Sequence, residues 1–498
     1  MKIRLLLIAM TIAGPALAAP DKWVHQGALT PAAQALLGEM RDAANYGLRP
    51  GDYRADALLA RAGAPLDATS AAALDLDVDS AVRRFVTHLH RGRFTPRSVG
   101  YDLDMAHGDF DADAATRILA ASAKPVEALA KFEPEFHHYR LLIAALRHYR
   151  ALLAAPQPAP LPPLGGPTIK PGQPYAGMHE LRARLAQLGD LEASALGTQT
   201  GNDLDAVTAM ALVRFQVRHR LEVDGALGRA TRDALNVPLA RRIRQLEFSI
   251  ERSRWLPSRL VSPLIIVNIP QFELFAFHSS DDREQDLLIM DVVVGKVFPE
   301  NNTPVFSADM TQVVLRPYWD VPRSILVNEL LPQIRANPNW VANNDFEIVR
   351  GAGDDGVVVA QDVASVAGLE SGALRLRQKP GPRNALGNVK FLFPNRYNVY
   401  LHDTPSQGAF AQSRRALSHG CVRVADPPAL ARYVLRNQPG WTEERIAAAM
   451  NAETGTRIAL KEPVRVYLIY ATAIALEDGR VLFFEDLYHH DEKLEKVW

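Results

Sequence analysis

The stretch that decides the fold class of the C-terminal half of the chain is LIIVNIPQFELFAF, residues 264–277. Its apolar side chains recur at every second position on both sides of a proline, at Ile265, Val267 and Ile269 and then at Phe272, Leu274 and Ala276. A period of two residues is typical of a β-strand that buries one face. We therefore predict strand structure before and after Pro270.

Similar strand-like runs follow at 287–294, 313–318, 389–393, 397–401, 464–475 and 481–484. Many short strands with few intervening helices favour a mostly antiparallel, β-sandwich-like domain over a βαβ fold. We place this domain at residues 262–491, followed by a tail at 492–498. Residues 324–381 are partly helical in pattern and rich in glycine, so we expect a lid-like insertion that caps the domain.

The N-terminal part of the chain has helical periodicity instead. Apolar residues recur at helical spacing at Leu142, Leu146, Tyr149 and Leu153. Ser80 is a candidate N-cap for a helix that buries Val82, Phe85, Val86 and Leu89. We predict an all-α scaffold domain at residues 19–155, so the whole chain is a multidomain α+β protein.

A proline-rich segment and a small helical unit come next. Residues 155–174 have the sequence APQPAPLPPLGGPTIKPGQP, which predicts a semi-rigid linker at 156–175 because proline blocks helices. Residues 176–238 predict three short helices, followed by a helical connector at 239–261. The spacing of Phe215-Gln216, Asp224-Gly225 and Leu235-Asn236 resembles the three-helix peptidoglycan-binding module of cell-wall enzymes. The alternative is a packing domain without a ligand.

Composition excludes several classes of function. The chain has 498 residues, 56 basic against 56 acidic side chains, and one cysteine. One hydrophobic core seldom exceeds about 250–300 residues, so we predict several domains. The balanced charge argues against an electrostatic grip on nucleic acid or on an anionic membrane. A single cysteine excludes an intrachain disulfide and a multi-thiolate metal site.

The first residues have the pattern of a secretory signal. Lys2 and Arg4 precede an apolar run at 5–12, and Ala16-Leu17-Ala18 is a small-residue cleavage site. We predict a cleaved signal peptide at 1–18, because the apolar run is shorter than the about 20 residues of a spanning helix. A retained membrane anchor is the alternative. Export to the periplasm is the expected localisation.

The only cysteine lies in a motif with several chemically useful neighbours, Ser418-His419-Gly420-Cys421-Val422-Arg423, and a second motif, Tyr400-Leu401-His402-Asp403, lies upstream. A free thiol is mostly protonated at neutral pH, and a nearby imidazole can take its proton. Gly420 lets the backbone turn sharply and bring amides to an oxyanion, and Arg423 suits a carboxylate. These residue types fit acyl transfer through a thioester.

Two other interpretations of the motifs stay open. Cys421 can be a small buried apolar residue with satisfied histidines around it. The side chains can also form a metal site, although paired-ligand spacings such as HExxH are absent; the residues concerned are His402, Asp403, His419 and Cys421.

The two motifs together resemble the catalytic signature of the L,D-transpeptidases, which have YkuD-type domains. Further segments follow in the order of that family: 267–270, 294–296, 303–304, 317–322, 384–387, 390–391, 466–467 and 478–480. The Tyr-Leu-His-Asp-Thr-Pro string, the insertion and the preceding module resemble the large periplasmic branch of Gram-negative bacteria. The resemblance implies an acyltransferase of peptidoglycan biosynthesis that contributes to cell-wall organisation and cell shape.

The resemblance also implies a role for each motif residue. Cys421 attacks the carbonyl between meso-diaminopimelate and the terminal D-Ala of a tetrapeptide stem, and D-Ala leaves as a thioester forms. The side-chain amine of diaminopimelate on a second stem then attacks, which cross-links the two peptides. His402 is implied as the base, and His419 and Gly420 are implied to shape the oxyanion site.

Four further residues are expected at the substrate. Tyr400 shares a strand face with His402, and Trp319 either lines the site or packs in the core. Arg423 holds either the cysteine loop or a carboxylate, and Ser418 is a structural hydroxyl. Asp403 stands where many small family members have glycine, and it either forms a turn or orients His402.

We expect no metal and no cofactor. The implied partners are donor and acceptor stem peptides and other cell-wall synthesis proteins, with no nucleic acid and no membrane span after signal cleavage. The thiol is an expected target of carbapenems. The alternatives are an L,D-carboxypeptidase or hydrolase that uses the same thioester, a non-catalytic wall-binding scaffold, and a metal-dependent peptidase.

Overall fold

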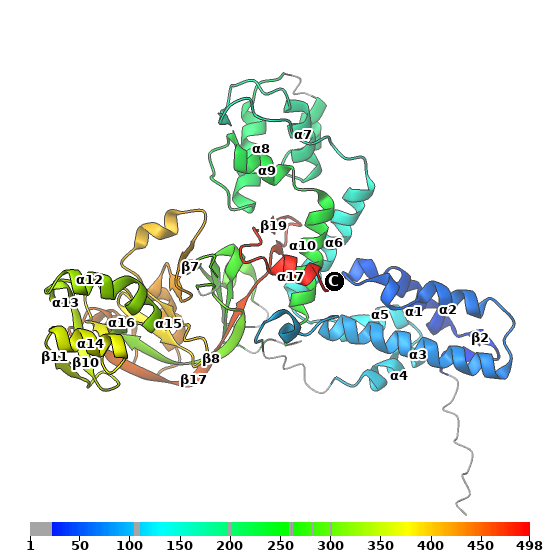
Figure 1. The fold of residues 1–498 in the computed structure, drawn as a ribbon. Helices are drawn as coiled ribbons and strands as arrows, with labels where there is room; N and C mark the ends of the chain where they lie inside the picture. The colour runs from blue at the N-terminus through cyan, green and yellow to red at the C-terminus, as the bar shows by residue number, and fades with distance from the viewer. Residues whose placement is uncertain are drawn as a thin grey trace, which may run out of the picture. The chain divides into compact units, whose positions relative to one another are not determined.

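The computed structural model describes residues 22–103, 110–197, 201–257, 260, 262–279, 282–298 and 301–498. The predicted signal peptide at 1–18 lies outside these residues. The chain divides into two compact units (Figure 1), one of Met1–Ala44, Leu48–His90 and Asp109–Glu133 and the other of Asn45–Gly47, Arg91–Gly108 and Pro134–Trp498. Along the described residues, no helix combines the length and apolar character that crossing a membrane requires.

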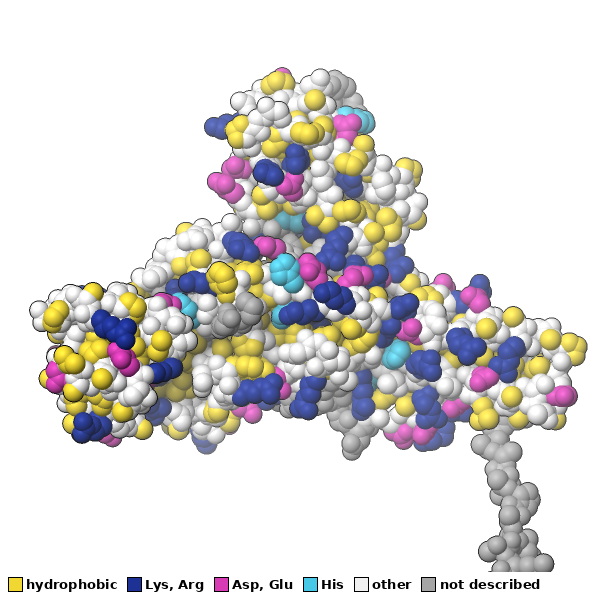
Figure 2. Space-filling view, viewed as in Figure 1, with side chains coloured by type: hydrophobic (Ala, Val, Ile, Leu, Met, Phe, Trp, Pro, Cys, Tyr) yellow, Lys and Arg dark blue, Asp and Glu magenta, His cyan; other side chains and the backbone are white. Residues whose placement is uncertain are grey.

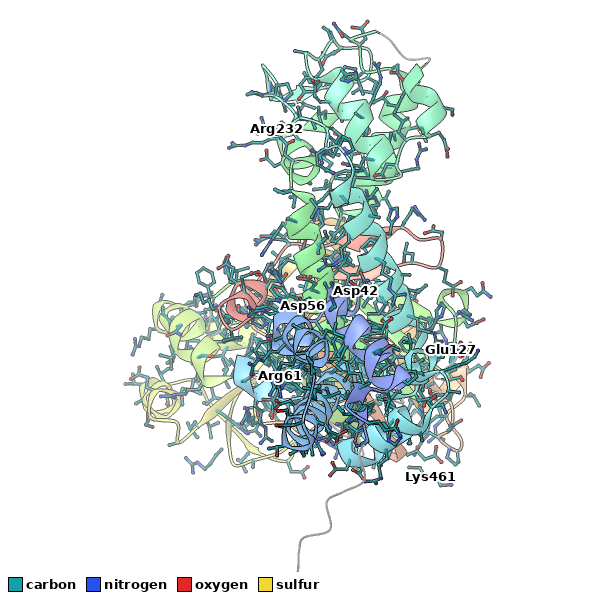
Figure 3. All side chains as sticks on the ribbon, turned by 90° about the vertical axis from the view of Figure 1, so that its right-hand side faces the viewer. Asp42, Asp56, Arg61, Glu127, Arg232 and Lys461 are labelled. Atoms are coloured by element: carbon teal, nitrogen blue, oxygen red, sulfur yellow. The ribbon has the colours of Figure 1, made fainter. Side chains whose placement is uncertain are left out.

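The first unit is helical, as predicted, and begins with a small hairpin of β1 (Val24–His25) and β2 (Ala28–Leu29). Its helices are α1 (Pro31–Arg41), α2 (Ala55–Ala62), α3 (Ala68–Arg91), α4 (Ala112–Ala121) and α5 (Pro125–Leu129). Buried side chains recur along α3 at helical spacing, at Leu74, Val78, Val82, Phe85 and Leu89. Asp42, Asp56 and Arg61, which are labelled in Figure 3, are exposed.

The predicted helix start at Ser80 is wrong. The helix α3 begins at Ala68, and Ser80 is an exposed residue inside it. Just before the helix, the Asp67 carboxylate accepts a hydrogen bond from the Ser70 N–H at 2.7 Å, as an N-cap does. Serine and aspartate favour caps, but they also occupy the solvent side of a continuous helix, so the residue type alone does not place the start.

Two long helices pack together in the second unit. Tyr139 and Leu146 of α6 (His137–Ala154) share a core with Ile243 and Leu246 of α10 (Leu239–Ser253). The hairpin of β18 (Ala473–Ala475) and β19 (Val481–Phe483) contributes to the same core. The helix α6 falls in the range 19–155 that we assigned to the scaffold, yet it packs within the second unit.

A three-helix module forms as predicted, from α7 (Met178–Gln187), α8 (Ala206–Arg218) and α9 (Arg229–Leu235), with a short pair of β3 (Thr168–Ile169) and β4 (Leu227–Gly228). Its core contains Leu181, Leu185, Ala211, Phe215 and Leu235. The proline-rich segment packs on this module, because Leu161 and Leu164 are part of its core. Asn236 holds Leu161 with two hydrogen bonds, at 2.7 and 3.0 Å.

The module contains a buried ion pair that yields a stability prediction. The Arg218 guanidinium donates to the Asp190 carboxylate at 2.5 and 2.8 Å, and the two side chains are 3% and 1% exposed. Asp190→Ala is expected to lower the free energy of unfolding by about 3–5 kcal/mol, because it leaves a buried guanidinium unpaired. Urea denaturation measures this loss.

Asp233→Ala is the matched control for Asp190→Ala. Asp233 pairs with Arg232, which is labelled in Figure 3, at 2.7 Å, but the Asp233 side chain is 52% exposed. Asp233→Ala is expected to lower the free energy of unfolding by less than about 1 kcal/mol. Equal losses in the two variants would contradict the prediction.

The C-terminal domain is mostly antiparallel β, as predicted. In the described part of the chain its main sheet has nine strands in the order β15-β7-β16-β14-β13-β8-β17-β5-β6, and an additional β6–β7 pairing closes the sheet on itself. These strands are β5 (Leu264–Asn268), β6 (Glu273–Phe277), β7 (Leu288–Gly295), β8 (Phe306–Leu315), β13 (Val389–Leu392), β14 (Leu401–His402), β15 (Ala416–Ser418), β16 (Val422–Val424) and β17 (Thr456–Ile469). The main sheet of this domain is thus one closed sheet, where a sandwich-like arrangement was predicted.

The pairing of β5 with β6 confirms the two predicted strands, with Val267 opposite Leu274 and both fully buried. The predicted alternation of burial holds for β6, whereas β5 is buried on both faces. Two helices, α15 (Pro427–Leu435) and α16 (Glu443–Met450), bury Leu430 and Ile446 in the same core. Acidic and basic side chains are interspersed over the visible surface (Figure 2), as the balanced composition leads us to expect.

The predicted insertion is a small α+β layer with its own core. A second sheet has the order β11-β10-β12-β9, formed by β9 (Trp319–Asp320), β10 (Phe346–Arg350), β11 (Val357–Val359) and β12 (Arg375–Gln378). Its helices are α11 (Arg323–Ile325), a π-helical turn at Leu326–Leu330, α12 (Leu331–Ala336), α13 (Trp340–Asn343) and α14 (Val363–Ser371). The core of the insertion includes Leu326, Ile334, Ile348, Leu369 and Leu376.

Candidate active site

The candidate site lies on one face of two neighbouring strands. The strands β14 and β16 run parallel, with Leu401 opposite Val422 and His402 opposite Arg423. Leu401 and Val422 are fully buried in the core. Because side chains alternate between the two faces of a sheet, His402 and Arg423 point to the other face.

Cys421 and Tyr400 each precede one residue of the core pair, so they share the face of His402 and Arg423. Cys421 is half-buried, and its Sγ lies 3.7 Å from the carbonyl oxygen of Asn398. Burial raises the pKa of the Cys421 thiol, while its contacts with Tyr400 and the charge of Arg423 lower it. The resting side chain is therefore a thiol that must lose its proton in order to react.

Tyr400 connects the thiol to the histidine and to the insertion. Its ring centroid lies 5.6 Å from that of His402, and its hydroxyl contacts the side chains of Cys421 and Trp319. Burial raises the pKa of Tyr400 well above its ordinary value, and the neighbouring Cys421 adds to the shift. The hydroxyl is therefore a neutral hydrogen-bond donor. Trp319 reaches the site from β9 and also packs against Phe346, with ring centroids 6.0 Å apart.

His402 is a buried, neutral imidazole. Its side chain is 4% exposed, and Nδ1 lies 2.5 Å from the carbonyl oxygen of Asp403. A carbonyl only accepts hydrogen bonds, so Nδ1 carries the proton and Nε2 keeps a free lone pair. Burial, followed by the charges of Arg423 and Lys390, lowers the pKa of His402 to about 3. The resting ring is thus neutral, with Nε2 unprotonated.

Asp403 shapes the backbone around His402. Its carboxylate accepts hydrogen bonds from the N–H groups of Asn388 and Thr404, at 2.7 and 2.6 Å. Burial raises the pKa of Asp403, and these two hydrogen bonds act in the opposite direction. The carboxylate therefore forms the turn, and it is the backbone carbonyl of Asp403 that orients the imidazole.

The loop before Cys421 is closed by short hydrogen bonds. Ser418 is 2% exposed; its Oγ donates to the carbonyl oxygen of Cys421 at 2.6 Å and accepts from the Gly420 N–H at 3.1 Å. Gly420 has φ +112, a conformation that favours glycine. Because the Gly420 N–H is used by Ser418, the Cys421 N–H is the better candidate for an oxyanion donor.

His419 and Arg423 differ in how they are held. The Nε2 of His419 lies 2.7 Å from Oε1 of Glu329, which belongs to the insertion. Among the described residues, by contrast, no acidic side chain pairs with Arg423, and its buried Nε has no hydrogen-bond partner. Burial lowers the pKa of Arg423, and a nearby anion would offset that cost.

The residues of the alternative metal site do not converge. The Asp403 carboxylate binds backbone N–H groups, and His419 contacts Glu329. Within the ranges that the structure describes, no three His, Cys, Asp or Glu side chains form a group that fits a metal ion.

Comparison with known proteins identifies the β domain. Residues 262–465 match the model of the L,D-transpeptidase catalytic domain, also named YkuD. The β domain is therefore similar to L,D-transpeptidase catalytic domains over most of its length. Residues 22–146 match a model described as "Scaffold domain", and residues 175–235 match one described as "Putative peptidoglycan binding domain".

A curated relative of the chain comes from Haemophilus influenzae and is named "Putative L,D-transpeptidase". It is 33% identical to this chain over 231 residues, which are 46% of this chain and 45% of the relative. The match thus spans less than half of the length of that relative.

Several residues that structure the site were not predicted as site residues: Thr303, Glu329, Lys390, Asn398 and Tyr488. Thr303 and Lys390 lie in segments that follow the family order, and Lys390 lies opposite His402 on the neighbouring strand β13. Asn398 lies two residues before Tyr400, whereas Glu329 and Tyr488 come from distant segments and carry no local pattern.

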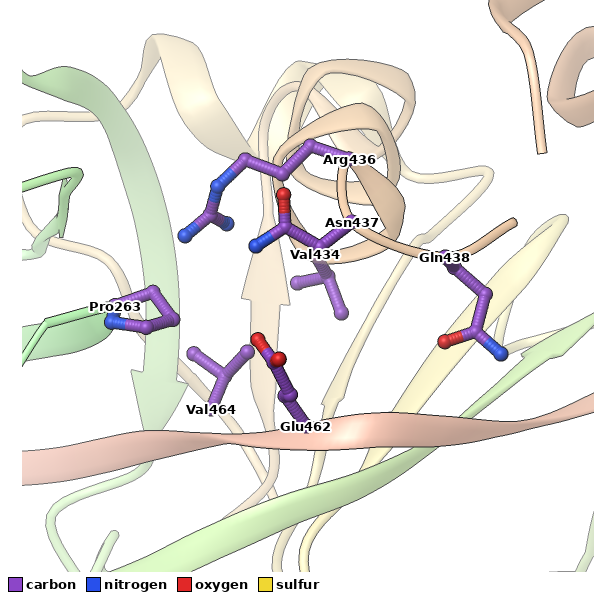
Figure 4. Close-up of a pocket in the computed structure, with 7 residues that line it drawn as sticks. All are labelled: Pro263, Val434, Arg436, Asn437, Gln438, Glu462 and Val464. Carbon is purple, nitrogen blue, oxygen red and sulfur yellow. The ribbon is translucent and has the colours of Figure 1, made fainter. Parts of the chain in front are cut away.

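One shallow pocket of the same domain lies away from these residues. It is lined by residues at the end of α15 and on β17, among them Arg436 and Glu462 (Figure 4). None of the predicted site residues lines it.

Proposed function

We propose that this protein is an exported L,D-transpeptidase that cross-links peptidoglycan through a thioester on Cys421. The observation that carries the proposal is the placement of three groups on one face of β14 and β16: the Cys421 thiol, a neutral buried imidazole, and a guanidinium that has no acidic partner among the described residues. The family of the catalytic domain supports the reaction class.

In the proposed first half-reaction, Cys421 acts as nucleophile and His402 as base. The Sγ bonds to the carbonyl carbon of diaminopimelate while the thiol proton passes to Nε2 of His402, and the carbonyl π electrons move to oxygen. As the tetrahedral intermediate collapses, the C–N bond to D-Ala breaks and the proton goes to the leaving amine.

In the second half-reaction, the diaminopimelate side-chain amine of another stem attacks the thioester. Its proton passes to His402, the C–S bond breaks, and the thiol is regenerated. The product is a peptide bond between two diaminopimelate residues. We assign Tyr400 and Trp319 to the substrate face, His419 to the wall of the site next to the insertion, and Ser418 and Gly420 to the shape of the cysteine loop.

We assign Arg423 to a stem carboxylate, since the guanidinium lacks an acidic partner among the described side chains. Arg423→Gln is expected to raise the KM for tetrapeptide about tenfold to a hundredfold, because a charge-assisted hydrogen bond is lost. Steady-state kinetics measures the change.

Arg414→Gln, which removes a 54% exposed guanidinium paired with Glu485, is the control and should leave KM unchanged. A fall in thermal stability with an unchanged KM would instead assign Arg423 to holding the loop.

The remaining parts of the chain fit the same proposal. We propose that residues 1–18 direct export to the periplasm and are cleaved, that residues 176–238 bind peptidoglycan, and that the helices of 19–155 serve as a scaffold. Binding of the module to peptidoglycan would bring the enzyme to its polymeric substrate.

Incubation of the chain without residues 1–18 with disaccharide-tetrapeptide, followed by mass spectrometry of the products, tests the function. Loss of D-Ala with formation of a dimer is the expected result. Loss of D-Ala with tripeptide alone would show hydrolysis, so that water and not an amine is the acceptor. No turnover would overturn the enzymatic proposal in favour of a wall-binding scaffold.

A further inference from the structure

Two buried hydroxyl groups connect the cysteine loop to the C-terminal end of the chain. The Oγ1 of Thr303 donates to the carbonyl oxygen of Gly420 at 2.8 Å and accepts from the Gly295 N–H at 2.9 Å. The Tyr488 hydroxyl donates to the carbonyl oxygen of Gly295 at 2.6 Å and accepts from the Thr303 N–H at 3.3 Å. Thr303 and Tyr488 are 1% and 3% exposed. Each hydroxyl therefore uses its only proton on a backbone carbonyl.

These hydrogen bonds determine the orientation of one peptide group. In a trans peptide the C=O of one residue and the N–H of the next point in opposite directions. Because the Gly420 carbonyl is directed at Thr303, the Cys421 N–H is directed away from it. The structure gives the Cys421 N–H no acceptor among the described residues, whereas the Gly420 N–H is bound to Ser418.

The neighbouring backbone leaves little room for another arrangement. A side-chain carbon added at Gly295 would lie 1.8 Å from the carbonyl oxygen of Asn301, so the two segments are in close contact. Burial raises the pKa of Tyr488 to about 12, which keeps the hydroxyl protonated at neutral pH. The two hydroxyls thus persist as donors under the conditions of the reaction.

We propose that Thr303 and Tyr488 are positioning residues that hold the Gly420–Cys421 peptide so that the Cys421 N–H stabilises the oxyanion at the acylated carbonyl. The inference rests on the proposed function for its natural substrate. When Sγ bonds to the carbonyl carbon, the electron pair that moves to oxygen meets an N–H already aimed at it. Tyr488 lies beyond residues 262–465, the part matched by the catalytic-domain model.

Two reagents separate oxyanion stabilisation from thiol reactivity. With p-nitrophenyl acetate, Sγ bonds to the carbonyl carbon, an oxyanion forms, and p-nitrophenolate leaves. With iodoacetamide, Sγ displaces iodide from a methylene carbon and no oxyanion forms. The rate of modification of Cys421 by each reagent is measured by intact mass in the full chain, with Cys421→Ala as background.

Thr303→Val is expected to slow acetylation of Cys421 about tenfold to a hundredfold, somewhat less than the 10²–10³ found for removing a direct donor. Its alkylation rate should stay within about twofold of the unmodified chain. Thr303→Ser should restore acetylation, because it keeps the hydroxyl. Tyr488→Phe should also slow acetylation of Cys421, but less than Thr303→Val does, because the Tyr488 hydroxyl acts through Thr303.

Tyr433→Phe is the matched control. Tyr433 is also buried, and its hydroxyl donates to the backbone carbonyl oxygen of Phe277 and lies 3.1 Å from that of Leu264, but it does not reach the cysteine loop. Tyr433→Phe should change neither the acetylation rate nor the alkylation rate of Cys421. Equal slowing of both reagents in Thr303→Val, or unchanged acetylation, would overturn the inference. If the reagent pattern holds but the unmodified chain does not consume disaccharide-tetrapeptide, the proposed function fails and the positioning role stands.

Discussion

Cys421→Ala is expected to abolish the release of D-Ala from a tetrapeptide stem, with a loss of about 10⁴-fold or more in kcat. The effect is large because the proposed thioester needs a sulfur nucleophile and the chain has no second cysteine. The measurement is the time course of tripeptide and dimer formation by mass spectrometry.

The fold is expected to survive the change. Cys421 is half-buried, its Sγ has only a long contact of 3.7 Å with a backbone carbonyl, and its core neighbour Val422 is untouched. The free energy of unfolding should therefore change by less than about 1 kcal/mol. Cys421→Ser is the control of similar shape, and its weaker nucleophile should also lose turnover. Retention of more than a small fraction of the activity in Cys421→Ala would exclude the thioester.

His402→Gln is expected to lower the rate of acylation by about 10²–10⁴-fold, because no group remains to take the thiol proton. Glutamine can still donate a hydrogen bond to the Asp403 carbonyl, so the turn should persist. The measurement is the burst of D-Ala release in a single turnover. A rate equal to that of the unmodified chain would exclude His402 as the base.

The same variant is expected to change how stability depends on pH. The folded-state pKa of His402 is about 3, against an ordinary value of about 6.5. A depressed histidine pKa means that the unfolded chain binds the proton first. The contribution of the neutral His402 imidazole to the free energy of unfolding is therefore complete above about pH 6.5. It is lost as the pH falls towards 3, by about 1.4 kcal/mol per pH unit.

Urea denaturation of both proteins at pH 7, 5 and 4 measures this difference. The unmodified chain should lose stability more steeply than His402→Gln below pH 6. Other buried histidines with lowered pKa values, such as His490 and His219, titrate equally in the two proteins and cancel in the comparison. Parallel losses in the two proteins would contradict the neutral, buried state of His402.

Local pattern accounts for the elements that the sequence predicted well. The apolar pattern in residues 264–277 predicted β5 and β6. One-face burial with a period of two is found in β6, whereas all five residues of β5 are buried. Helical spacing likewise predicted the three helices of the module and the face of α6 that includes Leu142 and Leu146. Element boundaries were less certain, as Ser80 shows, since polar residues occupy both caps and exposed helix faces.

Packing decided several features that local pattern does not contain. The proline-rich segment was predicted as a spacer from its backbone stiffness, but Leu161 and Leu164 are buried in the module. The insertion was expected to be partly helical, yet it also forms a four-stranded sheet in the described residues, because Trp319, at one end, pairs with Gln378, near the other. Such pairings depend on which strands meet, and sequence spacing does not determine this.

By itself, the sequence determined which residues are candidates for the chemistry: one thiol, a histidine upstream, and a glycine and an arginine beside the thiol. Only the tertiary structure decided how they act together. The parallel register of β14 and β16 places His402 beside Arg423, which with burial lowers the pKa of the imidazole. The hydroxyl of Thr303 reaches the cysteine loop from a distant segment, and that of Tyr488 binds Thr303 and Gly295 behind it. The physical reason is that side-chain identity is local, whereas burial, charge and hydrogen-bond geometry arise from contacts between segments that only folding brings together.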